Sequence, residues 1–264
     1  MPLMEKQEFI KKCRQIREQL AIKSNKTHCS HLGSAYSIVD ILVYLFNAKM
    51  NFDKDNYKSD SRDIFVLSKG HASLALYAVL HDLGIISDKE FEGYYQNGSY
   101  LIGHVNHKVP GVEFSTGSLG HGLPVAAGMA LGYKLSKKQN RVFCLVGDGE
   151  CDEGSIWETL RFIKLQNLTN ITVMIDFNKL QGIPVSEKKH VLLEKMLPSV
   201  GLNMMTIDGH DFDDIKKAFD KKPQLILANT IKGKGVSFME NQLAWHYKSV
   251  SDEQLAQVLK EIRK

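Results

Sequence analysis

The chain has 264 residues, of which 43% are hydrophobic, and its formal net charge is +4. This length supports one large domain with a substantial core and is too short for two large domains. Lysines are interleaved with acidic residues, as in residues 213–217, so the charge pattern predicts a solvated surface and disfavours a nucleic-acid interface.

The N-terminus shows no basic segment followed by an apolar one, and no apolar run approaches the length of a membrane span. We therefore expect a cytoplasmic protein with no membrane association. The four cysteines are Cys13, Cys29, Cys144 and Cys151, and none are in CxxC spacing. This spacing favours buried thiols over a zinc or redox motif.

The first segment with possible chemistry is a polar break between two helical patterns. Apolar residues at helical spacing predict an amphipathic helix over residues 5–23, and an apolar pattern resumes over residues 38–46. The break between them contains His28 and His31. A histidine in such a loop is more often a capping or surface group than a catalytic one, so the residues alone leave both roles open.

A second histidine follows a short predicted strand. Residues 62–71 form a short β-prone run that ends in Ser-Lys-Gly-His, with His71 last, before a helical pattern over residues 72–83. A strand that turns through glycine into a helix directs backbone N–H groups of the helix N-terminus outward, which favours anion binding. A short helix over residues 88–95 then leads to a loop that contains His104 and His107.

Residues 114–123 form a glycine-rich loop. Gly117, Gly120 and Gly122 fall within six positions, just before a helix of small residues over 124–131. Glycines allow the backbone to approach a ligand closely, so this loop suits contact with a flat molecule.

The most informative stretch is residues 141–182. An apolar strand over 142–146 stops at Gly147-Asp148-Gly149, and a second strand over 171–175 stops before Asn178. Because the carboxyl ends of parallel strands open onto a common crevice, we expect Asp148 and Asn178 to converge there. A carboxylate and an amide oxygen, completed by backbone and phosphate oxygens, suit Mg²⁺. A simple tight turn at Gly-Asp-Gly is the alternative.

The remaining residues complete an alternating pattern. Strands are predicted over 204–207 and 225–228, with a helix over 212–219 between them, whereas residues 183–200 are interpreted as loop with a short helix. The pattern predicts an α/β fold, a three-layer sandwich with a mainly parallel sheet covered by helices on both faces, as one domain over residues 1–264. Ser251 is expected to cap a last helix over 252–262.

The Gly147-Asp148-Gly149 turn, with Asn178 about thirty residues later, resembles the thiamine diphosphate motif. The surrounding segments GDGECDEGSIWE and DFNKLQG are similar to those of the transketolase family. The resemblance covers nearly the whole chain but only the first half of an ordinary transketolase. It implies the diphosphate-binding domain of the thiamine diphosphate-binding fold, and the pyrimidine-binding and C-terminal domains are expected on a separate chain.

The resemblance also implies roles for particular residues. Mg²⁺, or another divalent ion such as Ca²⁺ or Mn²⁺, is expected on Asp148, Asn178 and the Leu180 carbonyl. His31 and His104 are expected at the reacting end of the cofactor. The remaining cofactor contacts implied by the family segments are His71, Gly117, Leu119, Gly147, Gly149, Glu153 and His246. Of these, His71, Glu153 and His246 are also expected among the catalytic residues.

Glu153 matches the family's acid that reaches across the subunit interface toward the activating glutamate, which itself lies in the pyrimidine-binding domain. Without the family match, Glu153 is a helix N-terminal carboxylate favoured by the dipole. The resemblance thus predicts the N-terminal subunit of a split transketolase. This enzyme would transfer a two-carbon ketol unit from a ketose or its phosphate to an aldose, with a C-terminal partner subunit, as a dimer of heterodimers.

Besides a non-catalytic regulatory relative, two alternatives stay open from the sequence. One is the diphosphate-binding subunit of another thiamine diphosphate enzyme, of the 2-oxo acid dehydrogenase or decarboxylase type. The other is a nicotinamide-binding Rossmann dehydrogenase, although no G-x-G-x-x-G follows an N-terminal strand.

Overall fold

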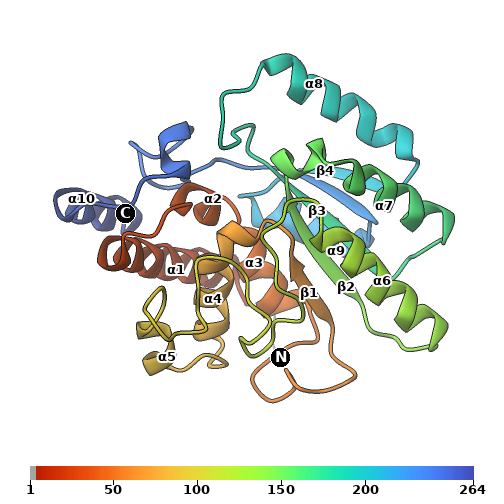
Figure 1. The fold of residues 1–264 in the computed structure, drawn as a ribbon, viewed down its shortest axis with the longest axis horizontal. Helices are drawn as coiled ribbons and strands as arrows, with labels where there is room; N and C mark the ends of the chain where they lie inside the picture. Colours follow the sequence, from red (N-terminus) through yellow and green to blue (C-terminus); the bar gives the residue numbers. More distant parts are fainter. Residues whose placement is uncertain (1–3) are drawn as a thin grey trace.

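The computed structural model describes residues 4–264 and contains one sheet (Figure 1). Five strands in this part of the chain are all parallel, in the order β1-β2-β3-β5-β4. Their bounds are β1 Ile64–Leu67, β2 Val142–Gly147, β3 Ile171–Phe177, β4 Met204–Asp208 and β5 Leu225–Asn229. The predicted strands and their parallel arrangement are confirmed.

The helices lie between these strands and at both ends of the chain. Before β2 they are α1 Lys6–Thr27, α2 Leu32–Tyr36, α3 Val39–Tyr44, α4 Ser73–Asp82, α5 Asp88–Glu92 and α6 Gly122–Leu135. After β2 they are α7 Gly154–Leu165, α8 Glu187–Met196, α9 Phe212–Lys221 and α10 Asp252–Ile262. Ser251 caps α10 as predicted, because its hydroxyl accepts a hydrogen bond from the Gln254 backbone N–H.

Both faces of the sheet are covered, because neighbouring strand residues alternate between two apolar cores. Phe65 and Phe143 belong to the core shared with α1, α3, α4 and α9, whereas Val66 and Cys144 belong to the core shared with α6, α7 and α8. In Figure 1, α6, α7 and α8 lie on one side of the sheet and α1 to α4 on the other. The three-layer sandwich is confirmed.

Two segments differ from the sequence expectations. Residues 183–200 contain α8, a helix of ten residues, followed by a 3₁₀ turn, so the region is more ordered than the expected loop with a short helix. The helical pattern over residues 38–46 is split, since α3 ends at Tyr44 and a π-helical turn covers Leu45–Lys49. Neither difference changes the sheet.

The carboxyl ends of β1, β2 and β3 lie next to one another. β2 pairs with β3 in a register that places Gly147 opposite Asp176, so the residues that follow both strands emerge at the same edge. β1 pairs with β2 on the other side and ends at Leu67, opposite Leu145. The predicted neighbourhood of Asp148 and Asn178 therefore follows directly from the strand pairing.

Within residues 4–264, no helix is both long enough and apolar enough to span a bilayer.

Candidate functional site

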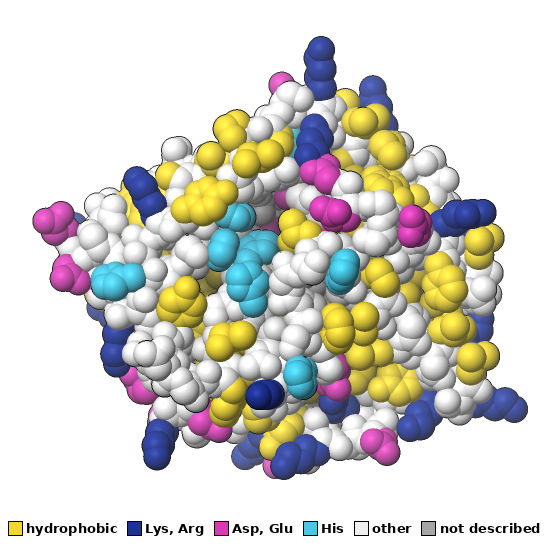
Figure 2. All heavy atoms as spheres, in the orientation of Figure 1, with side chains coloured by type: hydrophobic (Ala, Val, Ile, Leu, Met, Phe, Trp, Pro, Cys, Tyr) yellow, Lys and Arg dark blue, Asp and Glu magenta, His cyan; other side chains and the backbone are white. Residues whose placement is uncertain are grey.

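A cavity of about 410 Å³ opens at this edge of the sheet. Every site residue expected from the sequence lines it: His31, His71, His104, Gly117, Leu119, Gly147, Asp148, Gly149, Glu153, Asn178, Leu180 and His246. Figure 2 shows histidine side chains gathered beside a hollow in this face, with acidic side chains nearby. We call the part formed by Asp148, Asn178 and Leu180 the strand-end side and the part formed by the four histidines the histidine side.

The strand-end side is joined by hydrogen bonds between the two strand-end loops. Asp148 accepts one from the Gly149 backbone N–H at 2.8 Å and one from the Lys179 N–H at 2.7 Å. The second bond crosses from the loop after β2 to the loop after β3, where Lys179 has a positive φ of 62°. Asp148 thus fixes the position of the Asn178–Leu180 turn.

The orientation of the Asn178 amide follows from its partners. Its Nδ2 donates to Asp176 Oδ2 at 2.9 Å, and its Oδ1 accepts from the Leu180 N–H at 3.0 Å. The carboxylate of Asp176 accepts only, so the amide nitrogen must face it and the amide oxygen must face the Leu180 turn. Oδ1 keeps one lone pair for a further partner.

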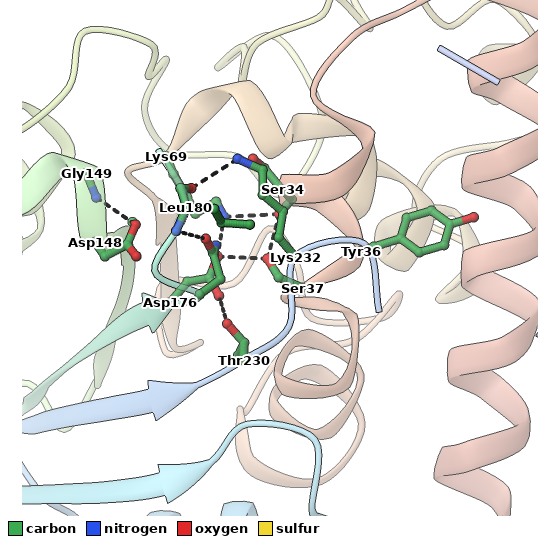
Figure 3. Close-up of polar contacts among 12 residues, drawn as sticks. Ser34, Tyr36, Ser37, Lys69, Asp148, Gly149, Asp176, Leu180, Thr230 and Lys232 are labelled. Carbon is green, nitrogen blue, oxygen red and sulfur yellow. Dashed lines mark hydrogen bonds and ion pairs between the residues drawn. The ribbon is translucent and has the colours of Figure 1, made fainter. Parts of the chain in front are cut away.

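Asp176 is the centre of a buried network beneath the strand-end side (Figure 3). Lys69 lies 2.5 Å from Asp176 Oδ2, Ser37 donates to the same oxygen at 2.7 Å, and Thr230 donates to Oδ1. Burial raises the pKa of Asp176, but the Lys69 charge and the hydrogen bonds from Lys69, Thr230 and Ser37 together outweigh it and hold that pKa below its usual value. Asp176 is therefore ionised and paired.

A second buried lysine lies beside the predicted Leu180 ligand. Lys232 Nζ donates to the Leu180 carbonyl at 3.0 Å and to the Gln181 carbonyl at 3.3 Å, and lies 3.0 Å from His246 Nδ1. Burial, with the charge of Lys69, lowers the pKa of Lys232 to about 8. A carbonyl oxygen has two lone pairs, so the lysine leaves room at Leu180 for one more partner.

The oxygens of the strand-end side are of the kind that hard cations prefer. No group of three or more His, Cys, Asp or Glu side chains between residues 4 and 264 is arranged to hold a metal ion. A divalent ion here would combine Asp148 with the Asn178 amide oxygen, a main-chain carbonyl and oxygens of its ligand, which is a donor set suited to Mg²⁺. Burial, reinforced by the charge of Asp176, raises the pKa of Asp148 to about 6. A nearby cation would oppose this shift.

The histidine side brings together imidazoles from distant parts of the chain. The ring of His31 lies 5.1 Å from that of His71, 5.9 Å from that of His104 and 4.9 Å from that of His246, measured between centroids. His31 has a positive φ of 68° at the start of α2, and its backbone N–H donates to the His246 carbonyl at 3.0 Å. The loop before α2 is thereby tied to the turn at residues 243–246.

The surroundings of all four imidazoles lower their pKa values, although His104 is more exposed than the others. Burial, aided by nearby charges, lowers the pKa of His31 to about 4 and that of His246 to about 3. Burial also lowers the pKa of His104, and burial together with the Lys69 charge places the pKa of His71 well below its ordinary value. A neutral imidazole can accept a proton at one nitrogen and donate from the other, which suits proton movement on hydroxyl and carbonyl groups.

Close contacts explain two of the glycines near this cluster. A Cβ at Gly70 would lie 2.4 Å from the Thr116 carbonyl oxygen, so only glycine allows the loop of residues 114–118 to approach the end of β1. A Cβ at Gly117 would lie 3.1 Å from His104 Cδ2. A small residue at position 117 therefore preserves the position of the imidazole.

Sequence reasoning missed the residues that hold the site in place. Asp176, Lys69 and Lys232 support the strand-end side, and Tyr77 supports the His104 loop by donating from its hydroxyl to the His104 carbonyl at 2.8 Å. Glu150 joins three segments, because it accepts hydrogen bonds from Ser68 Oγ, the Gly120 N–H and the Gly147 N–H. One signal was visible: Asp176 is a charged residue within an otherwise apolar strand, which predicts a buried paired charge.

Comparison with known proteins supports the family resemblance noted in the sequence. Residues 7–262 match the family model described as transketolase, thiamine diphosphate binding domain. The chain is 34% identical to one of the subunits of apulose-4-phosphate transketolase from Actinobacillus succinogenes, over 97% of this chain and 96% of that protein. It is also 34% identical to the 6-deoxy-6-sulfo-D-fructose transketolase subunit SqwG of a Clostridium species, over 94% of each.

A solved structure shows the same arrangement. The transketolase from Campylobacter jejuni matches with a TM-score of 0.88 at 27% identity, over 98% of this chain. This chain spans only 43% of that transketolase, whereas it spans nearly all of the two transketolase subunits. These matches do not support the nicotinamide-binding alternative. The chain belongs to the transketolase family and corresponds to its thiamine diphosphate binding domain.

Proposed function

We propose that this chain is one subunit of a two-chain transketolase that uses thiamine diphosphate and a divalent ion. Mg²⁺ is the ion that we expect. The observation that carries the proposal is the cavity that combines hard oxygens at two strand ends with four neutral imidazoles. The family match supports the cofactor, and the names of the two full-length relatives, both transketolase subunits, support the division into two chains.

In this proposal the strand-end side holds the charged end of the cofactor. Asp148, Asn178 and the Leu180 carbonyl would hold the ion, and the backbone at Gly147 and Gly149 would allow the diphosphate to approach closely. Gly117 and Leu119 would contact the flat ring. When bound, thiamine diphosphate supplies the electron sink for cleavage of the bond between two carbons of the ketose.

The histidine side would act on the sugar. His31 and His104 would take and return protons at substrate hydroxyl and carbonyl oxygens, and their lowered pKa values support this role because the acceptor nitrogens stay free. His71 and His246 lie near the buried Lys69 and Lys232 and would position the cofactor and exclude water. Substrates are proposed to be a ketose, or its phosphate, and an aldose acceptor.

The mouth of the cavity favours a covering chain. Leu119 and Ile183 both line the cavity, yet 38% and 64% of their surfaces are exposed. Glu153 also lines it and is exposed at the start of α7, with no side-chain capping bond. We propose that the C-terminal partner, with the pyrimidine-binding domain and its activating glutamate, covers this surface and meets Glu153. A cytoplasmic dimer of heterodimers is the expected assembly.

The test is reconstitution. The purified chain, thiamine diphosphate, Mg²⁺ and a ketose donor should give no turnover until the partner chain is added, and the pair should transfer a two-carbon unit to an aldose. Full turnover without the partner would refute the split site. Release of carbon dioxide from a 2-oxo acid, without ketol transfer, would instead favour the dehydrogenase or decarboxylase alternative.

A further inference from the structure

Arg17, Asp40 and His210 form a charged network outside the cavity, and it contacts the segment that carries Lys232. Arg17 of α1 donates to both oxygens of Asp40 of α3, at 3.0 and 2.6 Å, and His210 Nδ1 lies 2.6 Å from Asp40 Oδ2. The second ring nitrogen, His210 Nε2, accepts a hydrogen bond from the Ile231 backbone N–H at 2.8 Å. None of Arg17, Asp40 and His210 lines the cavity.

The partners of His210 fix its tautomer. Burial raises the pKa of Asp40, but the Arg17 charge and the His210 hydrogen bond outweigh it, so the Asp40 pKa lies well below its usual value and Asp40 only accepts. His210 must therefore carry its proton on Nδ1 and present a lone pair at Nε2. That lone pair faces the amide of Ile231, one residue before Lys232.

The segment that follows β5 is held at several points. The Thr230 N–H donates to the Phe177 carbonyl at 3.2 Å, and the Gly233 N–H donates to the Gly33 carbonyl at 3.0 Å. Ile231, between them, is held by the His210 side chain. On one side of this anchor Thr230 reaches Asp176, and on the other Lys232 reaches Leu180, Gln181 and His246.

We propose that His210 is a positioning residue for the cofactor site, which holds the Ile231 amide and thereby sets Lys232 against the Leu180 carbonyl and His246. Its tautomer is set in turn by Asp40 and Arg17. Loss of the imidazole lone pair would release Ile231, and Lys232 would then lose its fixed contact with His246 Nδ1.

The geometry of the surroundings permits a test by substitution. Arg17, Asp40 and His210 border a separate cavity of about 250 Å³, so a replacement side chain at position 210 has space to adjust. His210→Gln can offer an amide oxygen to the Ile231 N–H, whereas His210→Leu has a similar size and offers none. His190→Leu is the matched control. His190 is also buried, but it lies on α8, where its ring packs near Phe177 of β3.

The first measurement uses the cofactor-free chain and is independent of the proposed function. In ¹⁵N NMR spectra, the His246 Nδ1 signal should shift in His210→Leu and stay close to wild type in His210→Gln and His190→Leu. In the wild-type protein, a scalar coupling across the hydrogen bond should join the Ile231 amide nitrogen to His210 Nε2. This coupling needs no variant, and its absence would overturn the proposal even if His210→Leu does not fold.

The second measurement rests on the proposed function. The affinity for thiamine diphosphate with Mg²⁺ should fall about tenfold in His210→Leu, as expected for loss of one buried hydrogen bond, and recover in His210→Gln. A lower melting temperature with unchanged His246 signal and unchanged affinity would show a purely structural role and overturn the proposal. A shifted His246 signal in His210→Leu, together with a wild-type chain that binds no thiamine diphosphate, would contradict the function and leave the positioning role intact.

Discussion

The strand-end side and the histidine side of the cavity use polar residues in opposite ways. At the strand-end side, Asp148 and Asn178 already have hydrogen-bond partners within the chain, and a buried ion pair between Lys69 and Asp176 supports them. At the histidine side, the imidazoles lie against one another with lowered pKa values. In the proposed function, the first arrangement would fix oxygens for a charged group, and the second would keep bases neutral for proton transfer.

This comparison explains why the two sides need different surroundings. Oxygens that bind a cation must be held in place before the ion arrives. The strand-end side therefore depends on rigid strand ends and on hydrogen bonds that orient the oxygens. Groups that exchange protons need a free lone pair. The histidine side therefore depends on burial, which lowers the pKa of the imidazoles. Substitutions in the two sides should therefore change different measured quantities.

The largest effect is expected beneath the strand-end side. Lys69→Met leaves the Asp176 carboxylate buried without its cation, which should lower the free energy of unfolding by about 3 to 5 kcal/mol in denaturant titrations. The double variant Lys69→Met with Asp176→Asn removes both charges and should recover much of this loss. A double variant as unstable as the single one would show that the ion pair is not the cause.

A second substitution tests the proposed ion site directly. Asp148→Asn removes the only carboxylate among the proposed ligands, so the affinity for thiamine diphosphate in Mg²⁺ should fall by more than about 100-fold, beyond the usual cost of losing an outer-shell partner. Calorimetric titration measures this, with Glu194→Gln on the exposed face of α8 as the control. Wild-type affinity in Asp148→Asn would remove the ion from the proposal.

The histidine side should respond in rate and not in cofactor affinity. In the enzyme reconstituted with its partner, His104→Asn should lower kcat about 100-fold, the usual scale of proton-transfer catalysis, while the dissociation constant for thiamine diphosphate changes less than about threefold. His107→Asn is the matched control, because His107 is exposed and does not line the cavity. Equal losses in both variants would argue against a role for His104 in proton transfer.

The smallest effect is a pH dependence that needs no substitution. Because burial lowers the pKa of His31 to about 4, the imidazole should stay neutral in NMR titrations down to about pH 5. A depressed pKa in the folded state means that protonation opposes folding. The stabilising effect of the neutral ring is therefore complete above about pH 6.5 and is lost as the pH falls toward 4. Titration of His31 near pH 6.5 would contradict the burial argument.

Much of the architecture could be predicted from local pattern. The strands at residues 142–147 and 171–177 are short apolar runs that end in Gly147-Asp148 and Asn178, and such runs identify buried parallel strands and their ligand-facing ends. The motif between them indicated the family, and residues 7–262 match it. The extent of α8 was missed, because its polar, mixed sequence gives a weak helical period.

The sequence by itself determined the two strand ends that carry Asp148 and Asn178, and the family resemblance predicted the four histidines that the structure brings to the same cavity. Only the tertiary structure decided what supports them. Lys69, Asp176 and Lys232 are far apart in the chain, and their contacts depend on the parallel pairing of β1, β2, β3 and β5. A buried charge is stable only beside its partner. The packing of distant segments brings that partner into place, and a local pattern of residues carries no information about this packing.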